Sequence, residues 1–531
     1  MRGFPWFTSA PLILTTLVPG IAPVFAQSIT PANDGTGTLV NQAQSRFDIT
    51  GGTPAGSNLF HSFQDFGLDP GETARFIAPN DIANILGRVT GGNVSVIQGL
   101  IEVTGASSNL FLMNPAGFIF GSGASLNLPG SFTATTATGI GFEQGWFGVS
   151  GTPDFATLVG SPNQFYFSAL DSDRPLGEIY NFGDLRVGEG ASLTLLGRSL
   201  LNEGTLAAGQ VNLMAVPTGE SLILSQPGMV LSLEVAPLEE GLLVDSVRLL
   251  DLPLLLTGGT DGVPALVENA DGSVRLVTSS PKTPTLAIES LVQAGIVEAL
   301  EGNAFLQAPH VTVSGDIAVG GQPLGRGGQV TILGNDLQFQ GASIDASGEA
   351  GGGSIKIGGD LRGSGTLPQA AQVSIDAETV LTADALVSGN GGEVVVWSTE
   401  HTQFEGFVSA RGGAKSGDGG LIEISSKDQL WLGDWLNQVD LTAPQGEAGL
   451  LLLDPVNITI AAGSRGGITT SPWSVNTLGA ADISAFLESV GSLEITTAAA
   501  GSDAGDITMS NATISWTSAN DLKLVADRSI R

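Results

Sequence analysis

The chain has 531 residues with 75 glycines, no cysteine and three histidines, and its 20 basic and 52 acidic side chains give a net charge of −32. The lack of cysteine excludes thiol catalysis, disulfide bonds, iron–sulfur clusters and cysteine-based zinc sites. The negative charge opposes binding to nucleic acid and stable insertion at an anionic membrane, while a mean hydropathy of +0.25 excludes a disordered acidic tail.

The first 26 residues have the pattern of an export signal. Arg2 supplies a positive charge, residues 12–18 are mostly apolar, and Pro19 and Gly20 end that run well short of the ~20 residues that span a bilayer. Small residues at the −3 and −1 positions predict cleavage between Ala26 and Gln27. We therefore expect a mature protein that leaves the cytoplasm.

Four motifs follow one another between residues 58 and 135. They are residues 58–66 (NLFHSFQDF), 83–92 (ANILGRVTGG), 108–121 (SNLFLMNPAGFIFG) and 130–135 (GSFTAT). In order, spacing and residue type they resemble the amino-terminal secretion domain of filamentous-haemagglutinin-like exoproteins, the passengers of two-partner secretion. The resemblance implies a capped β-helix that a dedicated outer-membrane transporter recognises.

The third motif contains a turn that the resemblance marks as a secretion motif. Asn114, Pro115, Gly117 and Phe118 fall where the family has its Asn-Pro-Asn-Gly-Ile turn, although Ala116 and Phe118 depart from that pattern. A second family motif, Asn-Pro-Asn-Leu, has no counterpart. Pro fixes φ and Gly permits conformations that other residues resist, which favours a β-turn holding two rungs in register. The alternative is direct contact between an exposed turn and the transporter.

Internal repeats begin after residue 180. Asn181-Phe182-Gly183-Asp184-Leu185 recurs 21 residues later as Asn202-Glu203-Gly204-Thr205-Leu206. A Gly-Gly-x-apolar-x-apolar pattern starts at Gly327, Gly352, Gly391 and Gly419, with spacings of 25, 39 and 28 residues. Alternating polarity predicts half-buried strands, and we expect Gly or Asn to supply positive φ at the corners between them.

Short strands repeated every 20 to 30 residues predict an all-β fold, a right-handed parallel β-helix (β-solenoid) with one rung per repeat. About 20 rungs at ~4.8 Å would make a rod on the order of 100 Å, with asparagine ladders at equivalent corners. A sandwich rarely has repeats of this period, and propeller blades need ~40 residues with a recurring signature.

The repeat pattern is interrupted over residues 231–300, which are richer in Leu, Pro and Glu and are predicted to be an insertion or joint. Helical periodicity predicts helices at residues 285–302 and 480–490. We expect a signal peptide at 1–26, a secretion domain at 27–230, and a second β-helical segment at 301–531. That segment ends in the alternating polarity of a strand, without a polar capping element. The unpaired backbone groups of its last rung would favour pairing with another strand edge.

No motif for catalysis or for a cofactor is present in the sequence. His61, His310 and His401 are far apart, and Gly-x-Ser-x-Gly elbows, phosphate loops and calcium nonapeptides are absent. Parallel β-helices host sugar-cleaving enzymes that use paired carboxylates, and the one suggestive pair, Asp171 and Asp173, precedes Pro175 in an expected turn. Three tryptophans in alternating strands are more typical of a buried core than of an exposed surface on which sugar rings stack: Trp397, Trp431 and Trp435.

The sequence therefore predicts a secreted, non-enzymatic two-partner exoprotein with no metal or cofactor, a surface adhesin or extracellular rod. Its expected partners are an outer-membrane two-partner secretion transporter and an unidentified surface or carbohydrate receptor. A polysaccharide-degrading β-helix and a secretion module for an effector beyond the carboxyl terminus are the alternatives.

Overall fold

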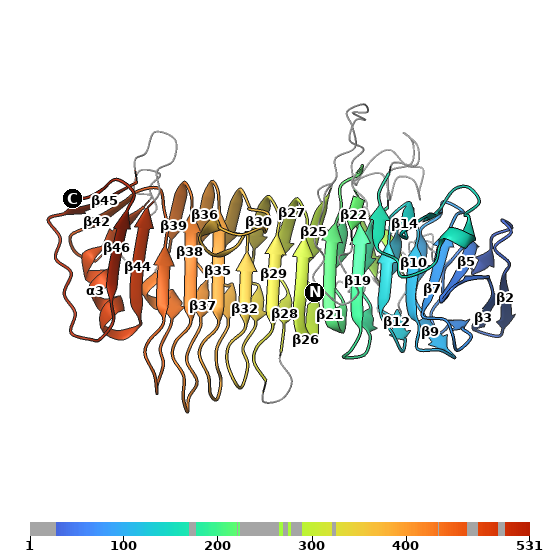
Figure 1. Ribbon diagram of the computed structural model, residues 1–531, viewed down its shortest axis with the longest axis horizontal. Helices are drawn as coiled ribbons and strands as arrows, with labels where there is room; N and C mark the ends of the chain where they lie inside the picture. Colours follow the sequence, from blue (N-terminus) through green and yellow to red (C-terminus); the bar gives the residue numbers. More distant parts are fainter. Residues whose placement is uncertain are drawn as a thin grey trace, which may run out of the picture.

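The computed structural model describes residues 28–168, 177–219, 221–223, 265–268, 274–277, 289–320, 325–433, 435–464, 476–497 and 505–531. These residues form an elongated rod of parallel strands stacked along one axis (Figure 1). The all-β prediction and the parallel β-helix are confirmed, because each strand pairs with the equivalent strand one turn later.

Three strand ladders form the faces of the rod. The first face holds β4 (Thr53–Ala55), β5 (Asn58–Asp65), β7 (Asn84–Val89), β10 (Asn109–Met113), β13 (Phe132–Thr135), β19 (Ser192–Gly197), β21 (Thr205–Ala215), β26 (Ile296–Gln307), β29 (Gln329–Leu333), β32 (Ser354–Ile357), β35 (Glu393–Ser398), β38 (Leu421–Ser426), β41 (Leu450–Leu453), β44 (Ser492–Thr497) and β46 (Leu522–Ala526). The long strands β21 and β26 turn a corner, so each also contributes to the second face.

The second face begins with an antiparallel hairpin that closes the amino-terminal end of the rod. It holds β2 (Thr38–Ala43), β3 (Arg46–Gly51), β6 (Thr73–Ile77), β9 (Leu100–Thr104), β12 (Ser125–Asn127), β18 (Asp184–Arg186), β28 (Asp316–Ala318), β31 (Ser343–Asp345), β34 (Val380–Thr382), β37 (Phe407–Ser409) and β40 (Val439–Asp440). The short β1 (Thr30–Pro31) pairs antiparallel with β5.

The third face is a ten-stranded parallel ladder. It holds β8 (Ser95–Ile97), β11 (Phe118–Phe120), β17 (Ile179–Asn181), β20 (Leu200–Asn202), β25 (Ser290–Gln293), β27 (His310–Val313), β30 (Asp336–Phe339), β33 (Gln372–Ile375), β36 (His401–Phe404) and β39 (Gln429–Leu432). A separate sheet follows at the carboxyl end, made of β42 (Ile458–Ala461), β43 (Thr477–Gly479), β45 (Asp506–Ser510) and β47 (Ser529–Ile530).

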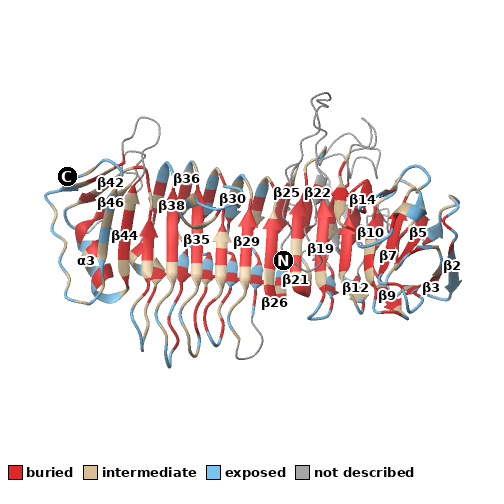
Figure 2. Cartoon of the chain, in the orientation of Figure 1, coloured by how far each residue is buried: buried red, intermediate tan, exposed pale blue. Residues whose placement is uncertain are grey.

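Apolar side chains from successive rungs stack into one continuous core. On the first face Ile355 is in register with Val394, and Val394 with Ile422, and all three are fully buried. Figure 2 shows the same concentration of buried residues in the strands, with exposed residues at the corners and ends. Because neighbouring rungs cover each other's apolar surface, no single repeat is stable alone.

The rod is shorter than the expected ~100 Å. The described part of the first face has fourteen stacked rungs from β5 to β46, which at about 4.8 Å per step gives roughly 60 Å. The repeat spacing overestimates the number of rungs because two excursions consume chain. Phe132 pairs with Leu193, 61 residues on, and Val211 pairs with Ala304, 93 residues on.

The repeated Gly-Gly pairs are corners, but their φ angles are not positive, which corrects the expectation. At each corner the second glycine N–H closes the turn, as in Gly392 N to Ala383 O at 2.7 Å. A Cβ on Gly392 would overlap the carbonyl oxygen of Gly353 in the rung below. Glycine is therefore required by the close approach of stacked backbones.

Asparagine ladders run along two corners, as predicted. Asn84 Nδ2 donates to Asn58 Oδ1 at 2.9 Å, and Asn109 Nδ2 donates to Asn84 Oδ1 at 3.0 Å. In the second ladder Asn181 Nδ2 donates to Asn202 Oδ1 at 2.7 Å. The 21-residue repeat seen in the sequence therefore corresponds to two adjacent rungs.

One predicted helix is present and the other is wrong. Residues Ala480–Ser489 form α3 and pack against the carboxyl-terminal rungs, and the short α2 covers Trp435–Gln438. Residues 290–302, in contrast, belong to β25 and β26. The core positions Leu291, Val297 and Ala299 alternate with period two, and stacking on β20 and β21 selects the strand.

Most of the predicted insertion at residues 231–300 lies outside the described residues. Its described parts are the hairpin of β23 (Ala265–Glu268) and β24 (Val274–Val277), and residues 289–300, which include β25 and the start of β26. The predicted end of the insertion is therefore wrong, because residues 290–300 already belong to rungs of the rod, in which β20 pairs with β25 and β21 pairs with β26.

Candidate functional site

The Asn114 turn is a hydrogen-bonded corner between β10 and β11. The Gly117 N–H donates to the Asn114 carbonyl at 3.0 Å, which closes a four-residue turn, and the Ala116 N–H donates to Asn114 Oδ1 at 3.0 Å. Asn114 Nδ2 donates to the Asn93 carbonyl and to Ser95 Oγ, both at 2.9 Å. The side chain of Asn114 thus holds its own turn and the preceding rung together.

This turn is buried, so an exposed contact loop is the wrong description of the folded state. Asn114 and Phe118 are fully buried, Pro115 and Gly117 are buried, and Ala116 alone is half-buried. The segment at Gly177 and Glu178 lies over the turn, because Gly177 N donates to Pro115 O at 2.6 Å and Phe118 N donates to Glu178 O at 2.9 Å. The next rung therefore covers the motif.

Two glycines, Gly117 and Gly177, allow residues 177–178 to pack directly on the Asn114 turn. Gly117 has a φ of +108°, and a Cβ there would lie 2.6 Å from the carbonyl oxygen of Glu178. A Cβ on Gly177 would overlap the backbone of Ala116. Any side chain at either position would push the two rungs apart.

Glu178 is an acidic side chain that the fold buries beside the turn. Burial raises its pKa to about 7, although the Tyr180 hydroxyl, which donates to Glu178 Oε2, and the charge of Arg198 act in the opposite direction. A carboxyl group with this pKa changes its protonation state near neutral pH.

A small antiparallel sheet, here called the cover sheet, packs on the outside of the first face. It consists of β15 (Trp146–Gly148), β14 (Gly139–Gly141), β16 (Gln164–Tyr166) and β22 (Ser221–Ile223), and the 3-10 turn η1 (Phe155–Thr157) lies nearby. Its inward residues Ile140, Phe147 and Phe165 form a second core with outward residues of the first face such as Phe60 and Met113. The first face is therefore buried on both sides over these rungs.

Arg88 joins the cover sheet to the amino-terminal end of the rod. Its Nε donates to Ser62 Oγ at 3.0 Å, its Nη2 lies 2.8 Å from Asp34 Oδ2, and its Nη1 donates to the Gly148 carbonyl. The guanidinium also lies 5.1 Å from the centroid of the Phe147 ring. Sequence reasoning did not single out Arg88, although a charged residue within the apolar run that follows Asn84, residues 85–89, was a usable signal.

The other candidate residues do not form a shared site. His310 and His401 occupy one column of the third face but are three rungs apart, roughly 14 Å, and His61 is buried on the first face near Phe63 and Phe76. Burial lowers the pKa of His61 to about 4, which keeps its ring neutral. Ala26, Gln27, Asp171 and Asp173 lie outside the described residues.

The three tryptophans belong to packed regions. Trp397 and Trp435 are buried, Trp435 lies 5.1 Å from the Phe486 ring, and Trp431 is partly buried against the core. Within the described ranges, no group of three or more His, Cys, Asp or Glu side chains could hold a metal ion. Among these same residues, no helix has the length and apolar character needed to cross a membrane.

Comparison with known proteins places the Asn114 turn, Arg88 and the cover sheet inside one family match. Residues 25–234 match the family model described as the TPS secretion domain. The HMW1 secretion domain from Haemophilus influenzae is 20% identical with a TM-score of 0.50, and the match covers 81% of this chain and 100% of that one. At that identity the likeness concerns the fold alone.

A filamentous hemagglutinin secretion domain is 14% identical with a TM-score of 0.30, over 75% of this chain and 99% of that one. No curated protein matches the chain.

Proposed function

We propose that this chain is a two-partner secretion exoprotein, because residues 25–234 match the model of the TPS secretion domain, and that an outer-membrane transporter recognises this domain through the Asn114 turn. The delivered rod then acts outside the cell as a surface adhesin or structural fibre. The burial of the Asn114 turn is the observation that shapes the proposal, because it limits when a transporter can reach the motif.

Recognition takes place before the secretion domain folds. In the folded rod Asn114 is fully buried and its amide is already bonded to the preceding rung. A transporter can contact this side chain only while Gly177 and Glu178 have not yet closed over it. The motif would then act twice, first as a signal in the extended chain and afterwards as a rung corner.

Secretion of matched variants tests this order of events. Asn114→Ala and Gly117→Val change the motif, whereas Ser95→Ala removes a hydrogen-bond partner of Asn114 and Gly177→Ala crowds the turn without altering the motif sequence. The proposal expects the motif variants to lose secretion at least tenfold when the transporter is present, and the two controls to lose thermal stability but remain secreted.

Equal secretion defects in both groups would mean that the transporter needs only a foldable domain. Normal secretion of Asn114→Ala would mean that the side chain carries no signal at all.

Export to the periplasm is assigned to residues 1–26, with cleavage between Ala26 and Gln27, and the secretion domain to residues 27–230. We assign residues 231–288 to an excursion between two parts of one rod and residues 289–531 to the continuing β-helix, because residues 290–300 already lie in rungs. The continuous pairing of β20 with β25 and of β21 with β26 supports a single rod.

A non-enzymatic role fits the burial of the Glu423 and Glu494 carboxyl groups on the first face. Glu423 is fully buried on the first face, and burial raises its pKa to about 7. The Arg362 N–H donates to Glu423 Oε2 at 2.7 Å, and the Arg362 guanidinium donates to Glu494 at 3.0 Å. Because backbone and guanidinium cover these carboxylates, a sugar chain has no access to them, which favours an adhesin over a polysaccharide-degrading enzyme.

A further inference from the structure

A loop of residues 359–369, here called the strap, crosses the outer side of the first face between β32 and β33. Its base is closed by a hydrogen bond from the Ala370 N–H to the Gly358 carbonyl at 2.8 Å. Gly359, Gly363 and Gly365 within it all have positive φ. A loop with a fixed base and several glycines can change its conformation locally while the rungs below it stay in place.

The tip of the strap is η2 (Leu361–Gly363), which contacts β35 and β38. Arg362 holds this tip to later rungs. Its N–H donates to Glu423 Oε2 at 2.7 Å, and its Nη2 donates to Glu494 Oε1 at 3.0 Å. The two acceptors lie on β38 and β44, 61 and 132 residues after Arg362, so one side chain fastens the strap across several rungs.

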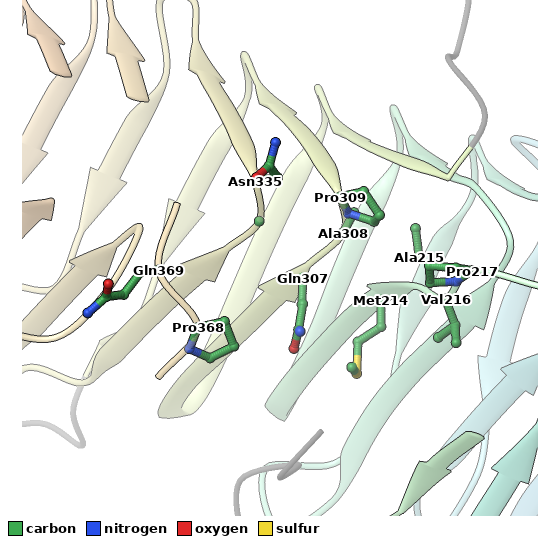
Figure 3. A pocket seen from close by; sticks show the side chains of 11 residues that line it. Met214, Ala215, Val216, Pro217, Gln307, Ala308, Pro309, Asn335, Pro368 and Gln369 are labelled. Atoms are coloured by element: carbon green, nitrogen blue, oxygen red, sulfur yellow. The ribbon is translucent and has the colours of Figure 1, made fainter. Parts of the chain in front are cut away.

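The other contacts of the strap leave the tip free to swing. Leu367 anchors the returning arm at the edge of the second core, and Pro368 and Gln369 border an open cavity of about 310 Å³ that separates the strap from the end of β21 (Figure 3). At the tip itself Gly363 packs so closely on Trp397 that a Cβ would lie 2.2 Å from the indole. The tip can therefore leave Trp397 without displacing the cover sheet.

Glu423 is the unusual group under the strap. Its side chain is fully buried, Oε2 accepts the Arg362 N–H, and Oε1 is buried without a hydrogen-bond partner. Its neighbours in register are Val395 and Leu452, which offer no side-chain donor. Because both oxygens of an ionised carboxylate need donors, this closed site disfavours the charged form of Glu423.

The charges around Glu423 act in the same direction on balance. Burial raises the pKa of Glu423 to about 7, although the hydrogen bond from the Arg362 N–H lowers it. The nearby carboxylate of Asp454 adds to the effect of burial. The other charged groups on the surrounding elements are paired with one another or with the strap: Lys356, Asp360, Glu393, Glu494 and Lys523.

We propose that the strap is a latch whose tip stays closed only while Glu423 carries a proton. The neutral carboxyl group tolerates the dry site beneath the tip. When Glu423 loses its proton to the solvent, the tip swings away and water reaches both carboxylate oxygens. Opening uncovers Trp397 and the carboxylates of this part of the first face, so their exposure depends on pH near neutrality. The latch is independent of the Asn114 turn, which lies in the amino-terminal rungs.

Limited proteolysis of the secreted protein with trypsin tests the latch, because Arg362 lies at the tip. The rate of cleavage after Arg362 is divided by the rate for a free peptide of residues 357–371, which removes the pH dependence of trypsin itself. We expect this ratio to rise about tenfold or more between pH 6 and pH 8.5 in the parent protein. It should stay low in Glu423→Gln, which keeps an acceptor for the Arg362 N–H but has no charge.

Two further variants sharpen the test. Glu393→Gln removes a carboxylate of the same face that lies 4.0 Å from Lys356 rather than at the tip, and it should behave like the parent protein. Gly363→Ala places a Cβ against Trp397, so its tip should be cut rapidly at both pH values.

A ratio that does not change with pH in the parent protein, or equally fast cleavage of Glu423→Gln at pH 8.5, would overturn the inference. Cleavage after Lys356 at the same rate as after Arg362 would also overturn it, because Lys356 lies within β32 and becomes accessible only when that rung unfolds. Slow cleavage of Gly363→Ala at pH 6 would contradict the latch as well, since contact with Trp397 would then not close the tip.

Discussion

Arg88 and Asp34 form an ion pair at 2.8 Å in which only 2% of the arginine side chain is exposed. Burial alone would raise the pKa of Asp34, but hydrogen bonds from Ser62, Thr36 and Arg88 together hold it well below its usual range. The same guanidinium bonds to β5 and to the cover sheet. One side chain thus connects the amino-terminal segment, the second rung and the outer sheet.

Loss of Arg88 should destabilise the secretion domain strongly. Arg88→Met removes the ion-pair partner of Asp34 and the donor to Ser62 Oγ and the Gly148 carbonyl, and losing hydrogen bonds of this buried charged group costs about 2–3 kcal/mol. Urea unfolding of the secreted protein, followed by near-ultraviolet circular dichroism, measures the change. Arg46→Met is the control, because Arg46 pairs with Asp48 at an exposed site and should cost less than about 1 kcal/mol. Similar losses in the two variants would contradict the role assigned to Arg88.

The stacked glycine corners predict a sharp contrast between two Gly→Ala substitutions. Gly392→Ala would place a Cβ against the Gly353 carbonyl, and we expect a loss of about 2–3 kcal/mol. Gly188→Ala has no atom within 4 Å of the new Cβ and no positive φ, so its stability should stay within about 0.5 kcal/mol of the parent protein. Thermal unfolding of both variants decides the point, and equal stability would refute close backbone packing at Gly392.

Glu178 should make the secretion domain less stable as the pH rises. Burial raises its folded pKa to about 7 from an ordinary value of 4.5, so between these values the folded state binds the proton more tightly than the unfolded state. The contribution of Glu178 to the free energy of unfolding is therefore fully present below about pH 4.5 and is lost as the pH rises through about 7. The loss is on the order of 3 kcal/mol.

Glu178→Gln should remove this part of the pH dependence, as measured by urea unfolding at several pH values between 4 and 8. Glu189→Gln, at an exposed position, is the control and should leave the profile unchanged. A steep fall that persists in Glu178→Gln would assign the effect to another buried acid, and Glu423 is the first to substitute.

Local patterns in the sequence predicted the parts of the fold that depend on neighbouring rungs. The Gly-Gly-x-apolar-x-apolar repeats predicted strand starts, and the repeat at Asn181 and Asn202 predicted two rungs in register. The helix predicted at residues 285–302 was wrong because the apolar residues there satisfy helical spacing as well as the alternation of a strand. Only stacking on β21, which is 90 residues earlier, distinguishes the two.

The burial of the candidate motif could not be predicted for a similar reason. Asn114 and Pro115 have the composition of an exposed turn, and the residues that cover them, Gly177 and Glu178, come about 60 positions later. Long-range register decides this burial, and no local pattern encodes it.

The most direct test of the account is secretion of residues 1–531 from a bacterial host with and without the cognate outer-membrane transporter. The account predicts that the protein reaches the medium or cell surface only when the transporter is present, and that without it the processed chain stays in the periplasm. Equal amounts outside the cell in both strains would contradict the assignment of this chain to two-partner secretion.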